Sequence, residues 1–280
     1  MNKNFILNAD DFGMSEAYNK AVLEGYNAKL LCSASLCANG DAFEEAVNEI
    51  IPKCNNLSVG VHLNIIEGKA LTDVPLLTDK NGIFNNGYTA IMKKSLSKDF
   101  LYQVEREFMA QIEKIQARTK IDHIDSHVHT HAIPNIFKLT LKLAKEYNIP
   151  YIRTQFENPY FVPSIKKHLN TKYPVNILKI ILLNFFTCIN KNELKKYNII
   201  TNDYLIGVGY TGMMDSMTIE FGLKSLKNKS NICAEALIHP CDYEFNDNHY
   251  TEFLITQNAE LKKSVEEIGF KITNHSFKAN

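Results

Sequence analysis

The sequence lacks an excess of charge of either sign. Its 280 residues hold 31 Lys and Arg against 31 Asp and Glu, and no cluster of basic residues stands out. A strong basic excess is typical of proteins whose main task is to bind nucleic acid. We therefore expect no nucleic-acid partner.

Paired cysteines, a signal peptide and a long apolar span are also lacking. The six cysteines are scattered without a CxxC pair, mostly in apolar runs, which predicts reduced core thiols. A strand-like run begins almost at the first residue, without the regions of a signal peptide. The most apolar segment, residues 175–189, is too short to span a bilayer and carries Lys179, so we expect a well-buried helix there. We expect a cytoplasmic protein without a membrane partner.

Strand-like runs alternate with helical periodicity along most of the chain. The eight runs that read as strands are "FILN", "SASLCAN", "LSVGVHLN", "IDHIDS", "PYIRT", "DYLIGV", "CAEALIH" and "FKITN". Such alternation predicts parallel strands joined by helical crossovers. We expect an α/β fold, barrel-like in the manner of a TIM barrel but irregular, as a single domain over residues 1–280. A doubly wound open sheet is the alternative.

Polar residues fall where the predicted strands end. They are Asp10, Asp11, Asn39, His62, Asn64, His127, His129, Arg153 and His239. In a barrel the C-terminal ends of the strands form one face, where active sites lie, so these residues are expected to converge. Two adjacent carboxylates after a buried strand are costly unless they are paired or bound to a metal.

The stretch "HIDSHVHTH" holds four of the nine histidines of the chain. His127, His129 and His131 alternate, so in an extended segment they would share a face. Imidazoles beside carboxylates are usual ligands of a divalent metal, and at most two from this stretch can reach one ion. One carboxylate with two imidazoles describes a hydrolytic metal site and equally the facial triad of non-haem iron oxygenases. The spacing does not separate these two.

Four segments together resemble the YdjC-like carbohydrate deacetylase family. They are "NADDFGMSEAYNKAV", "SASLCANGDAFEEAV", "VGVHLNIIEGKAL" and "HIDSHVHTHAIPNIF", in the family's order, and the resemblance returns around "TNDYLIGVGYTG" and "ALIHP". It implies a (β/α) barrel-like fold, a divalent ion, often a homodimer, and removal of the acetyl group from N-acetylated mono- or oligosaccharides such as chitobiose. The ion it implies is Mg²⁺, with Zn²⁺ as the alternative.

The resemblance also assigns roles by position. Asp11, His62 and His127 would be the metal ligands, and Asp10 the catalytic carboxylate that accepts a proton from water.

Other residues would serve the leaving group and the sugar. His239 stands where the family has a C-terminal His-Pro pair, and we expect it to protonate the leaving amine, with His129 as the second candidate. Asn39, Arg153 and His129 are expected to contact the sugar.

Three other functions remain open at this point. A phosphoesterase of the histidinol-phosphatase-like type is suggested by "HVHT", although that motif normally sits at the first strand. A retaining glycosidase would need two carboxylates about 5–5.5 Å apart across the sugar. A non-catalytic sugar-binding barrel is the third.

Overall fold

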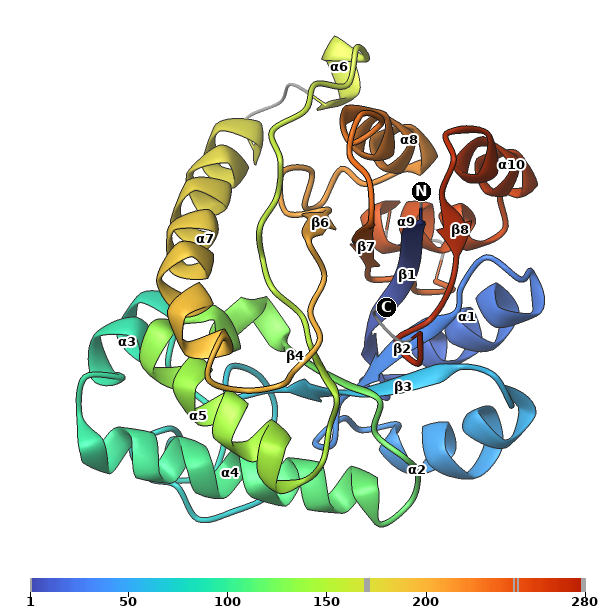
Figure 1. The fold of residues 1–280 in the computed structure, drawn as a ribbon. Coiled ribbons are helices and arrows are strands. Elements are labelled where there is room, and N and C mark those ends of the chain that lie inside the picture. The colour runs from blue at the N-terminus through green and yellow to red at the C-terminus, as the bar shows by residue number, and fades with distance from the viewer. Residues whose placement is uncertain (1, 169–171, 244, 246, 278–280) are drawn as a thin grey trace.

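The computed structural model describes residues 2–168, 172–243, 245 and 247–277, and a parallel sheet forms its centre (Figure 1). The strands are β1 (Lys3–Phe12), β2 (Ser33–Leu36), β3 (Ser58–Leu63), β4 (His123–Ser126), β5 (Tyr151–Ile152), β6 (Tyr204–Ile206), β7 (Ile232–Ile238) and β8 (Lys271–Ile272). They pair in the order β5-β4-β3-β2-β1-β7-β6, and β8 pairs with the start of β1. The seven strands of this path curl into a half-barrel, so the barrel-like α/β prediction is confirmed over the open doubly wound sheet.

The two ends of this path approach each other without forming a regular ladder. The Ile152 N–H donates to the Ile200 carbonyl at 3.0 Å. The Asn202 side chain then makes the two backbone hydrogen bonds that a neighbouring strand would make. Its Oδ1 accepts from Thr154 N at 2.6 Å, and its Nδ2 donates to Thr154 O at 2.8 Å. Side-chain bonds therefore satisfy backbone groups at the point where the barrel is irregular.

Helices surround the sheet in Figure 1. They are α1 (Glu16–Asn27), α2 (Phe43–Glu45), the single turns η1 (Ala46–Ile50) and η2 (Ile51–Lys53), α3 (Tyr88–Lys94), α4 (Lys98–Gln116), η3 (His127–Ala132), α5 (Pro134–Glu146), α6 (Ile165–His168), α7 (Lys172–Leu194), α8 (Ser216–Ser225), α9 (Asp247–Thr256) and α10 (Ala259–Glu267). The helix α4 packs on the sheet through one apolar face. Its residues Phe100, Phe108 and Ile115 recur at helical spacing and are all buried in the core.

The inside of the barrel is polar, whereas the apolar core lies between the sheet and the helices. Along β1, Leu7 and Ala9 belong to the apolar core. Asn8 and Asp10 have the opposite parity, and Asn8 Nδ2 reaches Ser35 Oγ on β2 at 2.8 Å. The period of two thus directs the polar residues of β1 toward the barrel interior.

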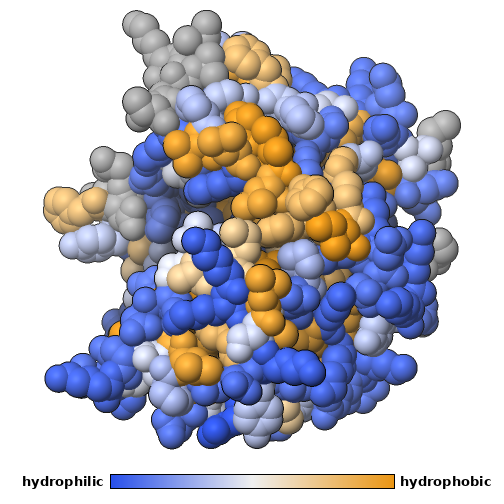
Figure 2. Space-filling view, turned by 90° about the vertical axis from the view of Figure 1, so that its left-hand side faces the viewer, coloured by the Kyte–Doolittle hydropathy of each residue, from blue (hydrophilic) through white to orange (hydrophobic). Residues whose placement is uncertain are grey.

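The outer face of α7 is exposed, so the prediction of a well-buried helix is wrong. Leu178, Ile181 and Phe185 are 67%, 60% and 60% exposed, whereas Ile180 and Leu183 on the opposite side are buried. Figure 2 shows this side of the molecule, where hydrophobic side chains gather. The expectation that this segment is too short to span a bilayer is also wrong, because α7 has 23 residues and extends beyond residues 175–189. By length and composition alone α7 is apolar enough to cross a membrane, with a mean hydropathy of 1.3, and a third of that stretch is buried. A helix that is apolar all round cannot be divided into inner and outer faces from its sequence.

Candidate active site

A β-bulge brings the two neighbouring carboxylates of β1 to one pocket. Between Ala9 and Phe12, β1 advances three residues while β2 advances two. Asp11, inside this bulge, has a left-handed backbone with φ of 61°. Strand neighbours ordinarily point to opposite faces, but Asp10 and Asp11 both line the same cavity.

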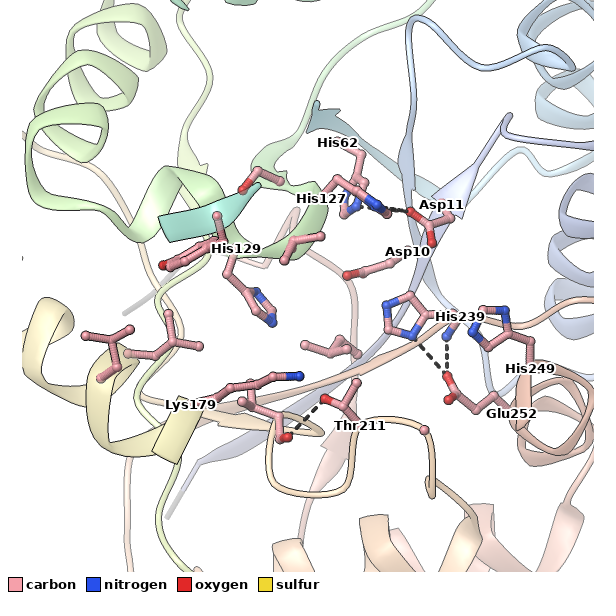
Figure 3. A pocket seen from close by; sticks show the side chains of 18 residues that line it. Asp10, Asp11, His62, His127, His129, Lys179, Thr211, His239, His249 and Glu252 are labelled. Atoms are coloured by element: carbon pink, nitrogen blue, oxygen red, sulfur yellow. Dashed lines mark hydrogen bonds and ion pairs between the residues drawn. The ribbon is translucent and has the colours of Figure 1, made fainter. Parts of the chain in front are cut away.

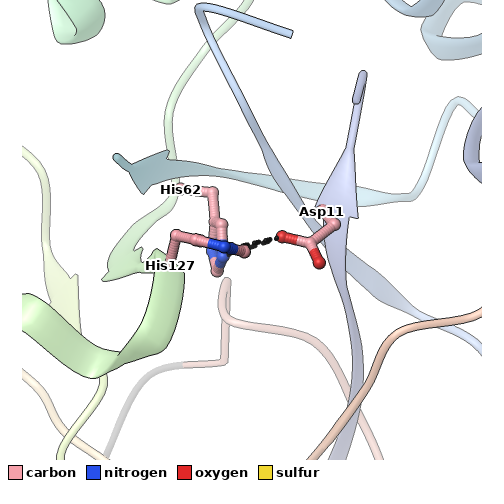
Figure 4. A group of neighbouring side chains, drawn as sticks. All are labelled: Asp11, His62 and His127. Atoms are coloured by element: carbon pink, nitrogen blue, oxygen red, sulfur yellow. Dashed lines mark hydrogen bonds and ion pairs between the residues drawn. The ribbon is translucent and has the colours of Figure 1, made fainter. Parts of the chain in front are cut away.

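Asp11, His62 and His127 form a compact group of ligand atoms from three separate strand ends (Figure 4). Asp11 Oδ1 lies 3.3 Å from His62 Nε2 and 2.9 Å from His127 Nδ1. One ligand atom of each residue lies within 4.8 Å of the others. This is the set that the family resemblance assigned as metal ligands, and the structure brings all three together.

Asp125 on β4 orients His62. Its Oδ1 lies 2.7 Å from His62 Nδ1, which keeps a proton on that nitrogen and turns Nε2 toward Asp11. Burial lowers the pKa of His62, but the Asp125 charge and the bonds to Asp11 and Asp125 raise it to about 10. A carboxylate oxygen, an imidazole oriented in this way and a second imidazole fit a divalent metal ion, and protons would compete with that ion.

The histidine-rich stretch is not extended, so the prediction that its alternating histidines share a face is wrong. Val128 and His129 have left-handed φ values of 53° and 57° inside η3. Because of these turns, His127 lies with Asp11 and His62, and His129 points into the pocket. His131 lies in the interior, where its Nε2 is 2.9 Å from the Arg153 carbonyl oxygen. Such backbone strain is common at functional sites.

Asp10 is held by Arg153, deep inside the barrel. Arg153 Nη1 and Nη2 lie 2.8 Å from the two oxygens of Asp10, and Asn8 Nδ2 donates to Asp10 Oδ1 at 2.8 Å. The same guanidinium contacts Asp125 at 2.7 Å and Glu235 at 2.6 Å. Burial raises the pKa of Asp10, but the charges of Arg153 and nearby histidines lower it further, so its net pKa lies well below the ordinary value. Asp10 is therefore ionised at neutral pH.

Arg153 and Asn39 do not lie where a sugar contact needs them. Arg153 is fully buried, and neither side chain lines the cavity. Asn39 Nδ2 donates to the carbonyls of Glu67 at 3.0 Å and Lys69 at 3.2 Å, which fixes the loop after β3. We correct the expected role of both residues, because each holds other protein groups in place.

His239 lies beside Asp10 on the same wall of the cavity (Figure 3). Its Nδ1 lies 3.2 Å from Glu252 Oε2, a carboxylate of α9 that is almost fully buried. Burial lowers the pKa of His239, but the bond to Glu252 and its charge raise it to about 9. The ring of His249 stacks beside it at 5.6 Å, and Tyr18 OH lies 2.7 Å from His249 Nδ1. Sequence reasoning missed Glu252 and His249, because no strand end marks them.

The cavity of about 450 Å³ has two unlike walls. One wall carries Asp10, Asp11, His62, His127, His239 and Glu252. The other comes from α7 and the loop after β6, and carries Lys179, Leu182, Leu183, Val208 and Thr211. His129 also lines the cavity, and burial holds its pKa well below the ordinary value, so its ring is neutral.

These features define a class: parallel α/β half-barrels with an aspartate–histidine group suited to a metal at the C-terminal ends of the strands. Residues 4–267 match the family described as YdjC-like protein. The chain belongs to this family.

Two curated relatives carry the same name. The chain is 39% identical over 147 residues to a carbohydrate deacetylase of Brevibacillus brevis, covering 52% of this chain and 57% of the relative. It is 34% identical over 161 residues to a carbohydrate deacetylase of Geobacillus stearothermophilus, covering 57% and 63%. The chain thus spans less than two thirds of the length of either relative.

A solved structure supports the fold. The chain superposes on the crystal structure of a proposed cellobiose-phosphate cleavage protein of Enterococcus faecalis with a TM-score of 0.74 and 23% identity. The superposition covers 98% of each chain.

Proposed function

We propose that the protein is a metal-dependent carbohydrate deacetylase that releases acetate from N-acetylated mono- or oligosaccharides. The observation that carries the proposal is the pair at the end of β1. Asp11 faces the two histidines, whereas Asp10, which forms a second possible ligand group with His62 and Asp125, is bound by Arg153 and faces the same cavity. Metal-assisted hydrolysis needs an ion and a free base side by side. The names of the curated relatives support the same reaction.

The residues divide the reaction between them. A divalent ion at Asp11, His62 and His127, when bound, supplies a Lewis acid for the acetamide carbonyl and for water. Asp10 accepts the proton of the water whose oxygen attacks the carbonyl carbon. His239 donates a proton to the amide nitrogen as the C–N bond breaks, which yields acetate and a free amine. Arg153 keeps Asp10 aimed and ionised.

The ligand chemistry also bears on the metal. Two imidazole nitrogens and one carboxylate suit a transition metal, whereas Mg²⁺ prefers oxygen ligands. We therefore propose that Zn²⁺ or a similar ion binds more tightly than the Mg²⁺ expected from the resemblance. Titration of metal-free protein with each ion, followed by calorimetry, measures the two affinities.

One assay separates the proposed reaction from its rivals. Purified protein is incubated with N-acetylglucosamine, N,N′-diacetylchitobiose and p-nitrophenyl phosphate, with and without a chelator. We expect acetate from an acetylated sugar and its loss on chelation. Release of phosphate would favour the phosphoesterase, cleavage of the glycosidic bond would favour the glycosidase, and sugar binding without turnover would favour the binding protein.

We further propose that a second copy packs on the outer face of α7. Val175, Leu178, Phe185 and Ile189 lie at positions of the alternating three- and four-residue spacing of a helix pair, and all four are exposed. Replacing Leu178 and Phe185 with Ser should turn a dimer into a monomer in light scattering. Leu96→Ser is the matched control, since Leu96 is 80% exposed elsewhere. Cytoplasmic location and the single domain over residues 1–280 stay predictions.

A further inference from the structure

Glu157 is a buried carboxylate outside the proposed catalytic group. It is fully buried, and its oxygens accept three backbone N–H groups. Val208 N lies 2.8 Å from Oε2, Gly209 N lies 3.2 Å from Oε2, and Gly207 N lies 3.4 Å from Oε1. No ion pair found in the described part of the chain includes Glu157. Successive N–H groups turned toward one point form an anion-binding nest, and here the anion is a side chain of the protein itself.

The nest belongs to the loop that follows β6 and forms part of the apolar cavity wall. Val208, Thr211 and Gly212 of this loop line the cavity. Gly207 has φ of 134°, which other residues rarely adopt. At Gly209 a Cβ would stand 2.9 Å from Ile180 Cδ1 on α7 and 3.3 Å from Glu157 Oε1. The loop thus lies close against both Glu157 and α7, and residues 207–212 form no β-ladder with a neighbouring strand.

The main chain of Glu157 is also tied to α7. Asn184 Oδ1 accepts from Glu157 N at 2.9 Å, and Asn184 Nδ2 donates to Glu157 O at 2.9 Å. The same helix places Leu182 and Leu183 in the cavity wall. Glu157 therefore connects both parts of this wall, the helix through its main chain and the loop through its side chain.

We propose that Glu157 is a positioning residue that holds the α7 and loop wall in place for the substrate, and that the wall loosens when this carboxylate takes up a proton. The inference rests on the proposed deacetylase function. Burial raises the pKa of Glu157 to about 7, and the three N–H bonds oppose that rise. A protonated carboxyl offers fewer acceptor positions to the three donors.

Few other groups that face Glu157 change charge near neutral pH. The phenols of Tyr160 and Tyr210 interact with it, and burial raises the pKa of both above the ordinary value. From α7, the facing side chains of Asn184 and Ile180 carry no charge. A change near pH 7 in the hydrogen exchange of this wall is therefore assigned to protonation of Glu157.

The variant Glu157→Gln keeps the size of the side chain but turns an N–H₂ group toward backbone donors. We expect KM for the acetylated sugar to rise about tenfold, the effect of one lost hydrogen bond to a charge, while kcat stays within about twofold. The KM of the wild-type protein should fall as pH rises through about 7, and the variant should lose this dependence. Glu107→Gln is the matched control, because Glu107 is equally buried and accepts the N–H groups of Leu71 and Thr72, away from the cavity.

Hydrogen exchange of residues 206–212, measured by mass spectrometry, tests the wall without relying on turnover. After correction for the intrinsic rate, exchange should be faster in Glu157→Gln, and in the wild type below pH 7. Faster exchange in a protein that does not deacetylate any tested sugar would support the role of Glu157 in holding the wall and would contradict the proposed deacetylase function. Unchanged exchange in the variant and across pH, with an unchanged KM, would overturn the role of Glu157. If Glu157→Gln does not fold, the pH dependence of exchange in the wild-type protein still tests the role of Glu157. Exchange that does not change across pH 7 would contradict that role.

Discussion

The two walls of the cavity are built in different ways. On the wall formed by β1, β3, β4 and the end of β7, charged partners fix the polar side chains: Arg153 holds Asp10, Asp125 holds His62 and Glu252 holds His239. On the α7 wall, apolar side chains lie on a helix whose outer face is exposed, and the Glu157 carboxylate and the Asn176 amide hold the neighbouring loop. In the proposed reaction, the chemistry would depend on the buried charge network, whereas the fit of the substrate would depend on the α7 wall, which no comparable network holds.

The largest effect should follow from breaking the charge network. Arg153→Met would leave Asp10, Asp125 and Glu235 buried without their common cation, so we expect a loss of about 3–5 kcal/mol in the free energy of unfolding. Urea denaturation measures it. The exposed pair of Arg118 and Glu44 provides the control, since Arg118→Met should cost less than about 1 kcal/mol. Equal losses in the free energy of unfolding for the two variants would mean that the buried network stabilises the protein no more than an exposed ion pair does.

A smaller effect is expected when the orientation of one ligand is lost. Asp125→Asn removes the charge that keeps the Nδ1 proton on His62, so metal affinity should fall about 10–100-fold. Competition with a chromophoric chelator measures the affinity. His62→Ala should abolish binding in the same assay. An Asp125→Asn protein with unchanged affinity would contradict the assigned tautomer.

The pH profile should move when Glu252 is neutralised. His239 has its pKa raised to about 9, so the protonated form needed to donate to the amine is present below pH 9 and lost above it. Stability linked to this proton is full below the unfolded pKa of about 6.5 and is lost as pH rises through 9. Glu252→Gln should shift the alkaline limb of kcat/KM to lower pH. An unmoved limb would exclude His239 as the acid.

The smallest effect belongs to the apolar wall. Leu182→Ala should raise KM about three- to tenfold and leave kcat nearly unchanged, because this side chain contacts the substrate equally before and during the reaction. Leu96→Ala is the control, because Leu96 is 80% exposed and does not line the cavity. A large drop in kcat for Leu182→Ala would mean that the two walls are not separate in function.

The sequence predicted the framework well because its signals are local. Each of the eight strand-like runs overlaps a strand, and Asp11, His62 and His127 meet because parallel strands end on one face. Alternation in the sequence did not reveal the left-handed turns at Val128 and His129, since two strained residues carry no periodic signal.

Contacts between distant residues could not be predicted. Arg153 stands at a strand end as a sugar-binding residue would, but it turns inward because carboxylates from β1, β4 and β7 meet there. The exposed side of α7 was missed because apolar residues occur on all of its faces.

Asp10 is proposed to be the general base, and Asp11 is proposed to be a metal ligand. Metal content and steady-state kinetics of Asp10→Asn and Asp11→Asn test these two roles most directly, with circular dichroism to check folding. Asp10→Asn should keep its ion and a similar KM while kcat falls about 10²–10⁴-fold, because a general base is lost. Asp11→Asn should lose the ion, since a neutral amide oxygen is a poorer ligand. An Asp10→Asn protein without metal, beside an Asp11→Asn protein that retains it, would contradict the account.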